Sequence, residues 1–250
     1  MTKVMLITGA SRGIGAATAR LAGQRGWDVA VNYARNSSAA EAVAAEIRKC
    51  GRKAVVIQAD VGRPEEILRL FRTADAEFGR LDGFFNNAGI VEKASKFIDI
   101  PLERLQRILA INTTGAFIAA QEAARRMSKS LGGQGGVIVN MSSMAAKLGG
   151  SGESTDYAVA KGAIDTLTVG LAKELAPEGI RVNAVRPGLI DTDIQKDFGV
   201  GDRVARYKGL VPMQRGGTAQ EVAEAVLWLC SDQSSYCTGL LLDVGGGRGL

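Results

Sequence analysis

Short β-rich runs alternate with longer helical patterns from one end of the chain to the other. Most of the β-rich runs are almost continuously apolar, as expected for parallel strands that are covered by helices on both faces. This alternation predicts an α/β fold with a doubly wound parallel seven-stranded sheet and helices on both faces. The expected strands are Lys3–Ile7, Asp28–Asn32, Lys53–Ala59, Leu81–Asn86, Gly136–Met141, Arg181–Arg186 and Leu240–Val244.

The helical patterns between these runs are long and amphipathic. They predict helices at Gly13–Arg25, Ser38–Lys49, Pro64–Phe78, Pro101–Ser128, Asp156–Ala176 and Thr218–Cys230. No composition shift, linker or internal repeat divides the chain, so residues 1–250 are predicted to form a single domain. Two stretches break the rhythm: the glycine-rich turn Leu131–Gly136, and residues 191–217, which have no clear strand. A long irregular segment in a compact domain is more often a binding loop than filler, so we expect a substrate lid there.

The first strand ends in a glycine-rich turn, Thr8-Gly9-Ala10-Ser11-Arg12-Gly13-Ile14-Gly15, and a helix begins inside it. Glycines let the backbone approach a pyrophosphate, and the helix N-terminus supplies N–H donors. The spacing is G-x-x-x-G-x-G instead of the G-x-G-x-x-G fingerprint, and such a turn can also serve tight packing alone. Its position after the first strand of an alternating chain favours nucleotide binding.

Polar segments follow two other strands. Asp60-Val61 closes the third, and Asn86-Asn87-Ala88-Gly89 closes the fourth. Doubly wound sheets bind their ligands at the carboxyl ends of strands. Asn, Asp and Gly also favour turns, so turn chemistry alone is an equal explanation for either segment.

The chain has no histidine, which excludes Ser-His-Asp and Cys-His nucleophilic sites and any zinc site that uses imidazole. Proton transfer near neutral pH then falls to Tyr, Lys, Asp, Glu or Cys. Ser142-Ser143 follows the fifth strand, and Tyr157 and Lys161 open the next long helix. At i and i+4 the tyrosine and lysine share a helix face, so the ammonium can stabilise the phenolate. A solvated surface pair is the alternative for these two residues alone.

In this order the motifs resemble the short-chain dehydrogenase/reductase family, which has a Rossmann-type fold. The resemblance spans nearly the whole chain, from Thr8-Gly9 through Asn112 and Tyr157-x-x-x-Lys161 to Arg186-Pro187-Gly188 and Thr238-Gly239. It implies an NADP-dependent oxidoreductase that transfers a hydride between nicotinamide and a carbonyl or secondary alcohol. Within the family, the sequence most resembles members named 3-oxoacyl-carrier-protein reductases or glucose dehydrogenases.

The resemblance also implies roles for individual residues. Tyr157 would exchange the proton with the substrate oxygen, Ser143 would hold that oxygen, and Lys161 would lower the tyrosine pKa and bind the nicotinamide ribose. Asn112 would anchor a water chain to solvent. The implied cofactor-binding residues are Gly9, Ser11, Arg12, Gly13, Ile14, Gly15, Asn32, Tyr33, Arg35, Asp60, Val61, Asn87, Ala88, Gly89, Tyr157, Lys161, Pro187, Gly188, Ile190 and Thr192.

The loop between the serine and the tyrosine departs from the family pattern. Ser143 and Tyr157 are one position further apart than is most common, with the glycine-rich run Leu148–Glu153 between them. We prefer Ser143 as the catalytic serine but leave Ser142 open. This loop is expected to line the substrate side. The lid mixes apolar residues with Arg203, Arg206 and Lys208, which allows either an acyl chain or a polar substrate.

The end of the second strand bears on the choice between NADP(H) and NAD(H). NAD-selective sites place an acidic side chain there, which repels a 2′-phosphate. Here the strand ends in Asn32-Tyr33-Ala34-Arg35, and Asp28 lies at its other end. Arg35 and Arg12 could converge on the phosphate, so we expect NADP(H), with NAD(H) less favoured. The alternative is that both are solvated surface arginines.

Three cysteines without C-x-x-C spacing indicate free thiols in a reducing compartment and, with the missing histidines, no metal site. Without a leader or a membrane-length apolar run, the expected location is cytoplasmic. The net charge of +5 is spread along the chain. We expect no nucleic-acid or membrane partner. Arg125, Arg126 and Lys129 either complement a helix dipole or steer an acidic carrier protein, and the dipole is favoured.

The two longest helices carry more small and apolar positions, among them Ala116, Ala119 and Ala123, than one face toward the sheet uses. Family members commonly bury such helices against a symmetry mate, so we expect a homotetramer, or at least a dimer. Two other functions stay open. One is a catalytically weak nucleotide sensor or scaffold on the same fold. The other is a sugar-nucleotide epimerase or dehydratase. Such enzymes usually need a larger substrate domain, and the 250 residues leave no segment to build one.

Overall fold

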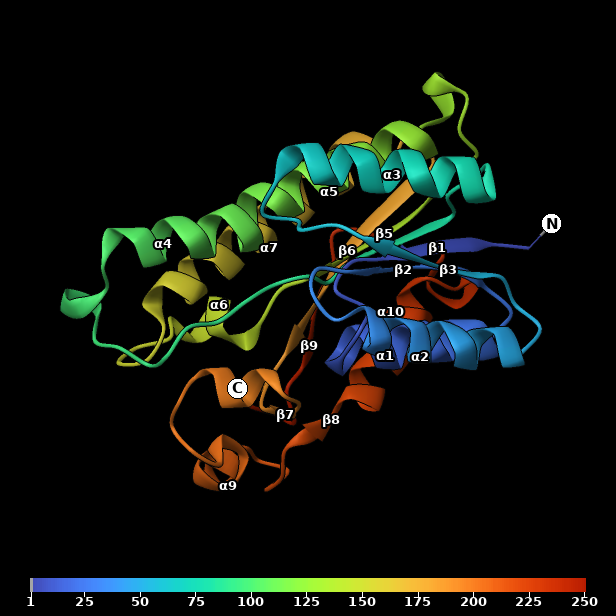
Figure 1. Cartoon of the computed structure of the whole chain (residues 1–250). Coiled ribbons are helices and arrows are strands. Elements are labelled where there is room, and N and C mark those ends of the chain that lie inside the picture. The colour runs from blue at the N-terminus through green and yellow to red at the C-terminus, as the bar shows by residue number, and fades with distance from the viewer. Residues whose placement is uncertain (1) are drawn as a thin grey trace.

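The computed structural model describes residues 2–250, and its centre is a seven-stranded sheet between two layers of helices (Figure 1). The strands are all parallel in the order β3-β2-β1-β4-β5-β6-β9. The chain runs outward from β1 in one direction and then from β4 in the other, which confirms the predicted doubly wound sheet. The strands are β1 (Val4–Ile7), β2 (Asp28–Tyr33), β3 (Ala54–Gln58), β4 (Gly83–Asn86), β5 (Gly136–Met141), β6 (Ile180–Pro187) and β9 (Leu241–Val244).

Helices cover both faces of this sheet, and each face has its own core. Figure 1 shows α1, α2 and α10 on one side and α3, α5 and α7 on the other. Side chains alternate along the strands, so Met5 and Ile7 pack into the first core and Leu6 into the second. The bounds are α1 (Gly13–Gln24), α2 (Ser37–Lys49), α3 (Pro64–Phe78), α7 (Thr155–Leu175) and α10 (Ala219–Leu229).

The segment predicted as one helix over Pro101–Ser128 contains a π-helical turn. It comprises α4 (Leu102–Leu109), the π turn η2 (Ala110–Gly115) and α5 (Ala116–Met127). The helix passes so close to the connection after β3 that a Cβ on Gly115 would lie 2.0 Å from the carbonyl oxygen of Val61. The predicted helix is therefore confirmed, and the π turn within it was not predicted. Such π turns often occur at functional sites.

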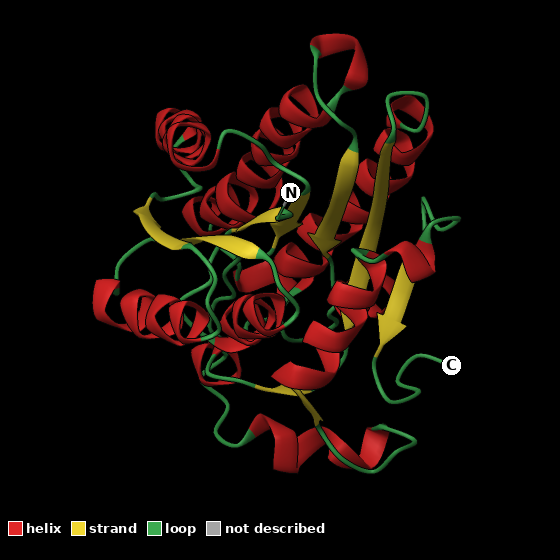
Figure 2. Cartoon of the chain, turned by 90° about the vertical axis from the view of Figure 1, so that its right-hand side faces the viewer, coloured by secondary structure: helices red, strands yellow, loops and turns green. Residues whose placement is uncertain are grey.

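The expected lid has secondary structure that its sequence did not indicate. It contains α8 (Ile194–Asp197), α9 (Arg203–Tyr207) and a 3₁₀ turn, η4 (Lys208–Leu210). Its two ends are held together by β7 (Ile190–Asp191) and β8 (Gly217–Thr218), which pair in parallel. Figure 2 shows these two short strands next to the lid helices at the bottom of the view. The prediction of no strand was wrong at these two ends.

Several short elements were also not predicted. One helix, α6 (Met144–Leu148), follows β5, and short 3₁₀ turns occur elsewhere. These are η1 (Phe97–Asp99), η3 (Lys129–Leu131) and η5 (Asp232–Ser234). No helix within residues 2–250 is long and apolar enough to cross a bilayer.

The basic cluster on α5 is paired internally. Arg125 and Arg126 both bind Glu122, and Arg126 also binds Asp75 of α3. Two carboxylates therefore offset much of the charge that could have attracted an acidic carrier protein. This pairing weakens the carrier hypothesis for Arg125 and Arg126.

Candidate active site

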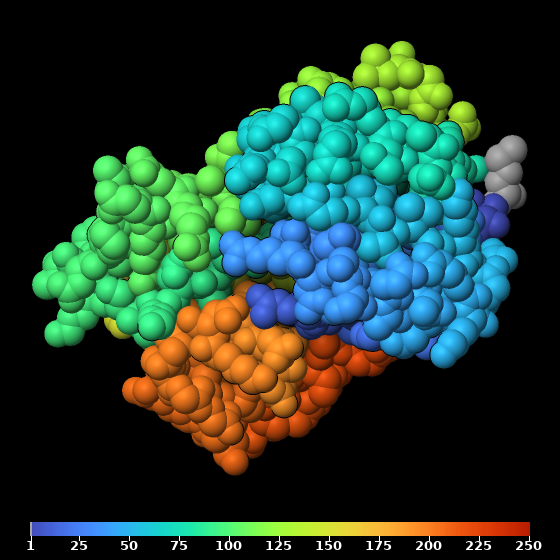
Figure 3. Space-filling view, viewed as in Figure 1, coloured from blue at the N-terminus to red at the C-terminus, as the bar shows by residue number. Residues whose placement is uncertain are grey.

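A cavity of about 1220 Å³ lies at the carboxyl ends of the strands. Its lining comes from the glycine-rich turn, the ends of β2, β3, β4 and β5, the start of α7 and the lid. In Figure 3 the surface is hollowed where the blue N-terminal segments, the green middle of the chain and the orange lid meet. The position matches the switch point of a doubly wound sheet, where ligands of this fold class bind.

The glycine-rich turn brings the N-terminus of α1 to this cavity. Gly9 and Gly13 have φ values of +63° and +56°, in the region that favours glycine. A Cβ on Gly15 would lie 2.5 Å from the carbonyl oxygen of Gly9, so no larger residue fits there without movement. Arg12 is the N-cap residue and its side chain does not cap the helix. The turn therefore offers a close backbone approach and helix N–H donors, which fits a pyrophosphate.

Three polar side chains hold the turn in place. Asn87 Nδ2 donates to the carbonyl oxygens of Thr8 and Gly9 at 2.7 and 3.1 Å. The hydroxyl oxygen of Thr8 accepts from the backbone N–H groups of Asn87 and Ala88 at 2.9 and 3.0 Å. Asn32 Oδ1 accepts from Gly9 N at 3.0 Å, and its Nδ2 donates to the carbonyl oxygens of Ile57 in β3 and Ala59 just after it. Asn32 and Asn87 thus use their amides to shape the site.

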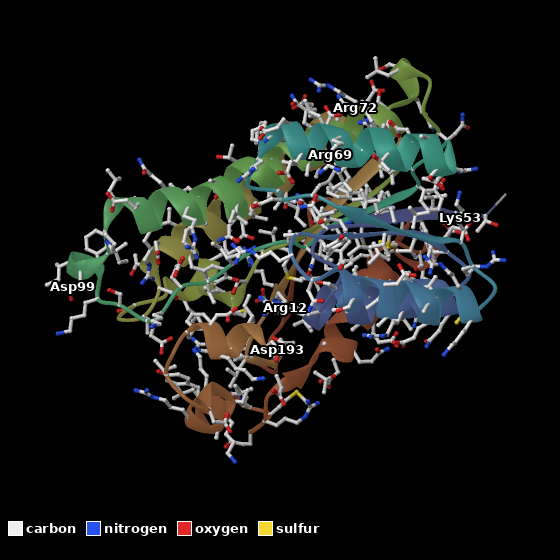
Figure 4. All side chains as sticks on the ribbon, in the orientation of Figure 1. Arg12, Lys53, Arg69, Arg72, Asp99 and Asp193 are labelled. Carbon is white, nitrogen blue, oxygen red and sulfur yellow. The ribbon has the colours of Figure 1, made fainter. Side chains whose placement is uncertain are left out.

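The end of β2 carries no acidic side chain, as the sequence indicated. Arg35 lines the cavity and belongs to no ion pair within residues 2–250. Arg12 also lines the cavity and pairs with Asp197 of the lid at 3.3 Å, with both side chains about half exposed. In Figure 4 Arg12 projects toward the lid, where Asp193 lies. One of the two arginines therefore shares its charge with the lid, and the other is free to bind an anion.

Ser143 and Tyr157 meet at the other end of the cavity. Ser143 is the N-cap of α6, where its Oγ accepts from Ala145 N at 3.0 Å. Burial raises the pKa of the Tyr157 phenol, while a hydrogen bond with Ser143 and the charge of Arg203 act to lower it. Ser142, by contrast, is buried and its Oγ donates to the carbonyl oxygen of Lys161 at 3.3 Å. The serine next to the tyrosine is therefore Ser143.

Lys161 lies one turn along α7 from Tyr157, with its Nζ 5.7 Å from the centre of the phenol ring. The side chain is 2% exposed, and Nζ donates to the carbonyl oxygen of Met141 at 2.7 Å. Burial lowers the pKa of Lys161 to about 8, against an opposing effect of Asp165. The contributions that lower the tyrosine pKa in this structure come from Ser143 and Arg203 rather than from Lys161.

Asn112 lies in the π turn η2 and is held by the loop after β4. Its Oδ1 accepts from Ile90 N at 2.9 Å, and its Nδ2 donates to the carbonyl oxygen of Ile90 at 2.9 Å. A Cβ on Gly89 would lie 2.6 Å from Asn112 Oδ1 and 3.5 Å from Lys161 Nζ. Because Gly89 has no side chain, the Asn112 amide and the Lys161 ammonium can both lie close to the loop after β4.

Most of the predicted site residues line the cavity, with two exceptions among the described residues. Asn112 lies behind the lining, as its contacts with Ile90 require. Tyr33 packs against the core under α1 because successive residues of a strand point to opposite faces of the sheet. Ser143 lines the cavity, and so do the remaining residues predicted to bind the cofactor. Outside the glycine-rich turn these are Asn32, Arg35, Asp60, Val61, Asn87, Ala88, Gly89, Tyr157, Lys161, Pro187, Gly188, Ile190 and Thr192.

Lining residues that the sequence left without a role come from the substrate loop and from the C-terminal segment. Glu153 of the loop and Arg203 of the lid pair at 2.6 Å, although the sequence only placed them in separate segments. Arg248 lies in the glycine-rich C-terminal run, far from both in sequence. The glycine-rich run was the only feature of the local sequence that could have pointed to Arg248. The pairing of Glu153 with Arg203 depends on tertiary contacts and has no local sequence signal.

Comparison with known proteins agrees with the geometry. A family model described as enoyl-(acyl carrier protein) reductase matches residues 9–248. The chain is 48% identical to an uncharacterized oxidoreductase, YgfF, of Escherichia coli (strain K12), over 98% of this chain and 99% of that protein. It is 37% identical to a 3-oxoacyl-[acyl-carrier-protein] reductase of Synechocystis, over 98% of this chain and 96% of that protein.

Solved structures show the same fold. A short-chain type dehydrogenase/reductase from Mycobacterium marinum has a TM-score of 0.91 and 39% identity, covering 98% of this chain and 95% of that one. A blue fluorescent protein from a metagenomic library in complex with NADPH has a TM-score of 0.91 and 33% identity, covering 99% and 98%. A 3-ketoacyl-(acyl-carrier-protein) reductase from Brucella melitensis complexed with NADH has a TM-score of 0.91 and 32% identity, again covering 99% and 98%. The chain belongs to the short-chain dehydrogenase/reductase family and is a nicotinamide-dependent oxidoreductase of CH–OH and C=O groups.

Proposed function

We propose that this enzyme is an NADP-dependent reductase of small carbonyl compounds, or in reverse a dehydrogenase of secondary alcohols, with Tyr157 as its acid/base. The observation that carries this proposal is the arrangement of Ser143, Tyr157 and Lys161 at one end of a cavity whose other end holds the glycine-rich turn and two arginines. A phosphate-binding end and a proton-transfer end in one cavity are what hydride transfer from a dinucleotide requires.

The three side chains divide the work on the substrate oxygen. The bound nicotinamide supplies the hydride that reduces the carbonyl carbon. Ser143 holds the substrate oxygen through its hydroxyl, and the phenol of Tyr157 donates a proton to it, which gives the alcohol. Phenol ionisation at neutral pH is costly, because the ordinary pKa of 10.0 is raised further by burial. The hydrogen bond with Ser143 and the charge of Arg203 offset part of this cost. We propose that the ammonium of Lys161, which is protonated at pH 7 because its pKa is about 8, adds to these effects as the phenolate forms.

Asn112 is proposed to return the proton from bulk water. Its amide is fixed at both ends by Ile90, in a π turn close to Lys161. A fixed polar group at this depth can order a short chain of water behind the lysine. We propose that this path reprotonates Tyr157 after each turnover.

Two features support NADP(H) rather than NAD(H). No carboxylate at the end of β2 can bind the ribose 2′-hydroxyl, and Arg35 lines the cavity without an acidic partner within residues 2–250. A guanidinium in this position fits a 2′-phosphate through charge-assisted hydrogen bonds. The pairing of Arg12 with Asp197 suggests that Arg35 carries more of the recognition.

We also propose a homotetramer in the cytoplasm. Phe117 of α5 and Val159 of α7 are 52% and 57% exposed on the outer faces of these helices. Ala116, Ala119 and Ala123, named above as surplus positions, are instead buried in the monomer core. A second copy would cover the exposed pair. Three unpaired cysteines support a reducing compartment.

The decisive test of the activity is NADPH oxidation against a panel of β-ketoacyl thioesters, sugars, diketones and aromatic aldehydes. Tyr157→Phe should lower kcat by ~10² to 10⁴, because it removes the proton donor while leaving the ring in place. Cofactor fluorescence should still report NADPH binding in this variant. NADPH binding without reduction of any carbonyl by the wild-type protein would favour the sensor alternative.

A further inference from the structure

Four residues from three separate segments meet at the substrate end of the cavity. Glu153 comes from the loop before α7, Arg203 and Tyr207 from α9 of the lid, and Arg248 from the C-terminal segment. Glu153, Arg203 and Arg248 line the cavity. Arg203 lies close enough to the phenol of Tyr157 for its charge to lower the tyrosine pKa. The cluster and the tyrosine therefore line the same cavity, with Arg203 within electrostatic reach of the phenol.

Glu153 has both carboxylate oxygens occupied within the cluster. One accepts from Arg203 at 2.6 Å, and the other accepts from the hydroxyl of Tyr207. The two partners hold the pKa of Glu153 below its ordinary value although burial acts to raise it. The carboxylate is therefore ionised, and each of its oxygens already accepts a hydrogen bond within the cluster.

Arg203 is fixed by two hydrogen bonds and a ring contact. Its two terminal nitrogens donate to Glu153 and to Gln195, at 2.6 and 2.9 Å. The guanidinium lies over the ring of Phe198, 4.0 Å from its centre. Its Nε is buried and has no hydrogen-bond partner among the described residues. A buried donor without a partner is costly, and the remaining contacts of Arg203 hold its positive charge at this wall of the cavity.

Arg248 has a charge but no acidic partner. None of the ion pairs within residues 2–250 includes it. Burial and, after it, the positive charge of Arg203 lower the pKa of Arg248. The cluster thus has two guanidinium groups and one carboxylate, which pairs with Arg203 alone, so one positive charge is uncompensated.

We propose that Arg248, which lines the cavity within the positive field of Arg203, binds a carboxylate on the substrate. The proposal rests on the proposed reductase function and adds the substrate class: a carbonyl or hydroxy compound that also carries an acid group. A monoanion balances the single excess charge, whereas a neutral substrate leaves it unpaired. The rest of this end of the cavity includes Leu148, Phe198 and Leu210, which suit a short apolar body between the two polar groups.

The test compares acids with their own methyl esters, which differ in charge at nearly constant shape. The probes are 3-oxobutanoate and 4-oxopentanoate with the corresponding esters, at saturating NADPH and constant ionic strength. For at least one pair, the wild-type kcat/KM should favour the acid. In Arg248→Gln the acid-to-ester ratio should fall by about 10- to 100-fold, the effect of losing a hydrogen bond to a charged group. Arg248→Lys should retain part of the ratio.

The matched control is Arg206→Gln, which removes the same charge from an exposed position on the same lid helix that does not line the cavity. Its acid-to-ester ratio should stay within about twofold of wild type. Equal ratios in the Arg248→Gln and Arg206→Gln variants would overturn the subsite, and so would a wild-type preference for the esters. In either case turnover of the esters leaves the reductase function intact.

A binding measurement separates the two proposals if none of the four probes is reduced. Pentanoate, which cannot react, is titrated calorimetrically into the wild-type protein saturated with NADP⁺. Weaker binding to Arg248→Gln, but not to Arg206→Gln, supports the carboxylate site even without turnover. Equal affinity for all three proteins, or no binding to any of them, overturns it.

Discussion

Replacing the buried lysine should make the protein more stable while it destroys the activity. Lys161 is charged at pH 7 in the unfolded chain and in the folded protein, but in the folded protein the ammonium is 2% exposed. Lowering its pKa from 10.5 to about 8 corresponds to a cost of about 3 kcal/mol at ~1.4 kcal/mol per tenfold change in ionisation. Lys161→Met removes this cost and keeps most of the side-chain volume.

The expected net gain is smaller because the ammonium also makes a hydrogen bond. Loss of its bond to the carbonyl oxygen of Met141 costs about 1 kcal/mol, so the free energy of unfolding should rise by about 2 kcal/mol at pH 7. Between pH 8 and pH 10.5 the unfolded chain binds more protons at this site than the folded protein does. The wild-type stability therefore recovers in this window, and by pH 10 the advantage of Lys161→Met should fall to about zero.

The assay is urea unfolding without cofactor at pH 7 and pH 10, at one protein concentration because an oligomer gains stability with concentration. Lys173→Met, an exposed lysine on the same helix α7, is the control and should show no comparable gain at pH 7. A Lys161→Met protein less stable than wild type at pH 7 would refute the reasoning. That result would mean that the fold stabilises the ammonium instead of paying to bury it.

Three further outcomes are expected. Arg35→Asp should weaken the use of NADPH by roughly 2 to 5 kcal/mol, measured as kcat/KM, while kcat/KM for NADH rises or stays the same. Arg72→Asp on the distant helix α3 (Figure 4) is the control, and a wild-type preference for NADH would contradict the assignment. Gly89→Ala should lower kcat, because the added Cβ would lie 2.6 Å from Asn112 Oδ1. Gly170→Ala on α7 has no atom within 4 Å of the added Cβ, so it should leave kcat unchanged and leave the stability unchanged or slightly higher. A normal kcat in Gly89→Ala would argue against the role of Asn112. Phe117→Arg should reduce the particle mass in light scattering, and a 26.2 kDa particle for the wild-type protein would exclude the proposed tetramer.

The sequence alone was sufficient to predict the sheet and the helices that cover it. Each strand is a short apolar run and each helix an amphipathic one, and these patterns depend on neighbours within a few residues. The boundaries of α3, Pro64–Phe78, agree with the prediction because a proline begins the helix and a glycine follows its end. The glycine-rich turn could be placed for the same reason, since it follows the first strand directly.

Features that depend on contacts between distant segments could not be predicted. The π turn at Asn112 fits against Ile90 and the carbonyl oxygen of Val61, neither of which is near it in sequence. The choice between Ser142 and Ser143 required the position of α7, because one serine bonds to the Lys161 carbonyl and the other lies against Tyr157.

The charge balance at the substrate end was also decided only by the tertiary structure. Glu153, Arg203 and Arg248 belong to a loop, a lid and a C-terminal segment, and each is an ordinary charged residue in its local sequence. Folding brings two guanidinium groups to a single carboxylate whose oxygens are already used. Sequence patterns record which side of an element is apolar, whereas the electrostatic balance of a cavity depends on distances between segments that only the packed fold brings together.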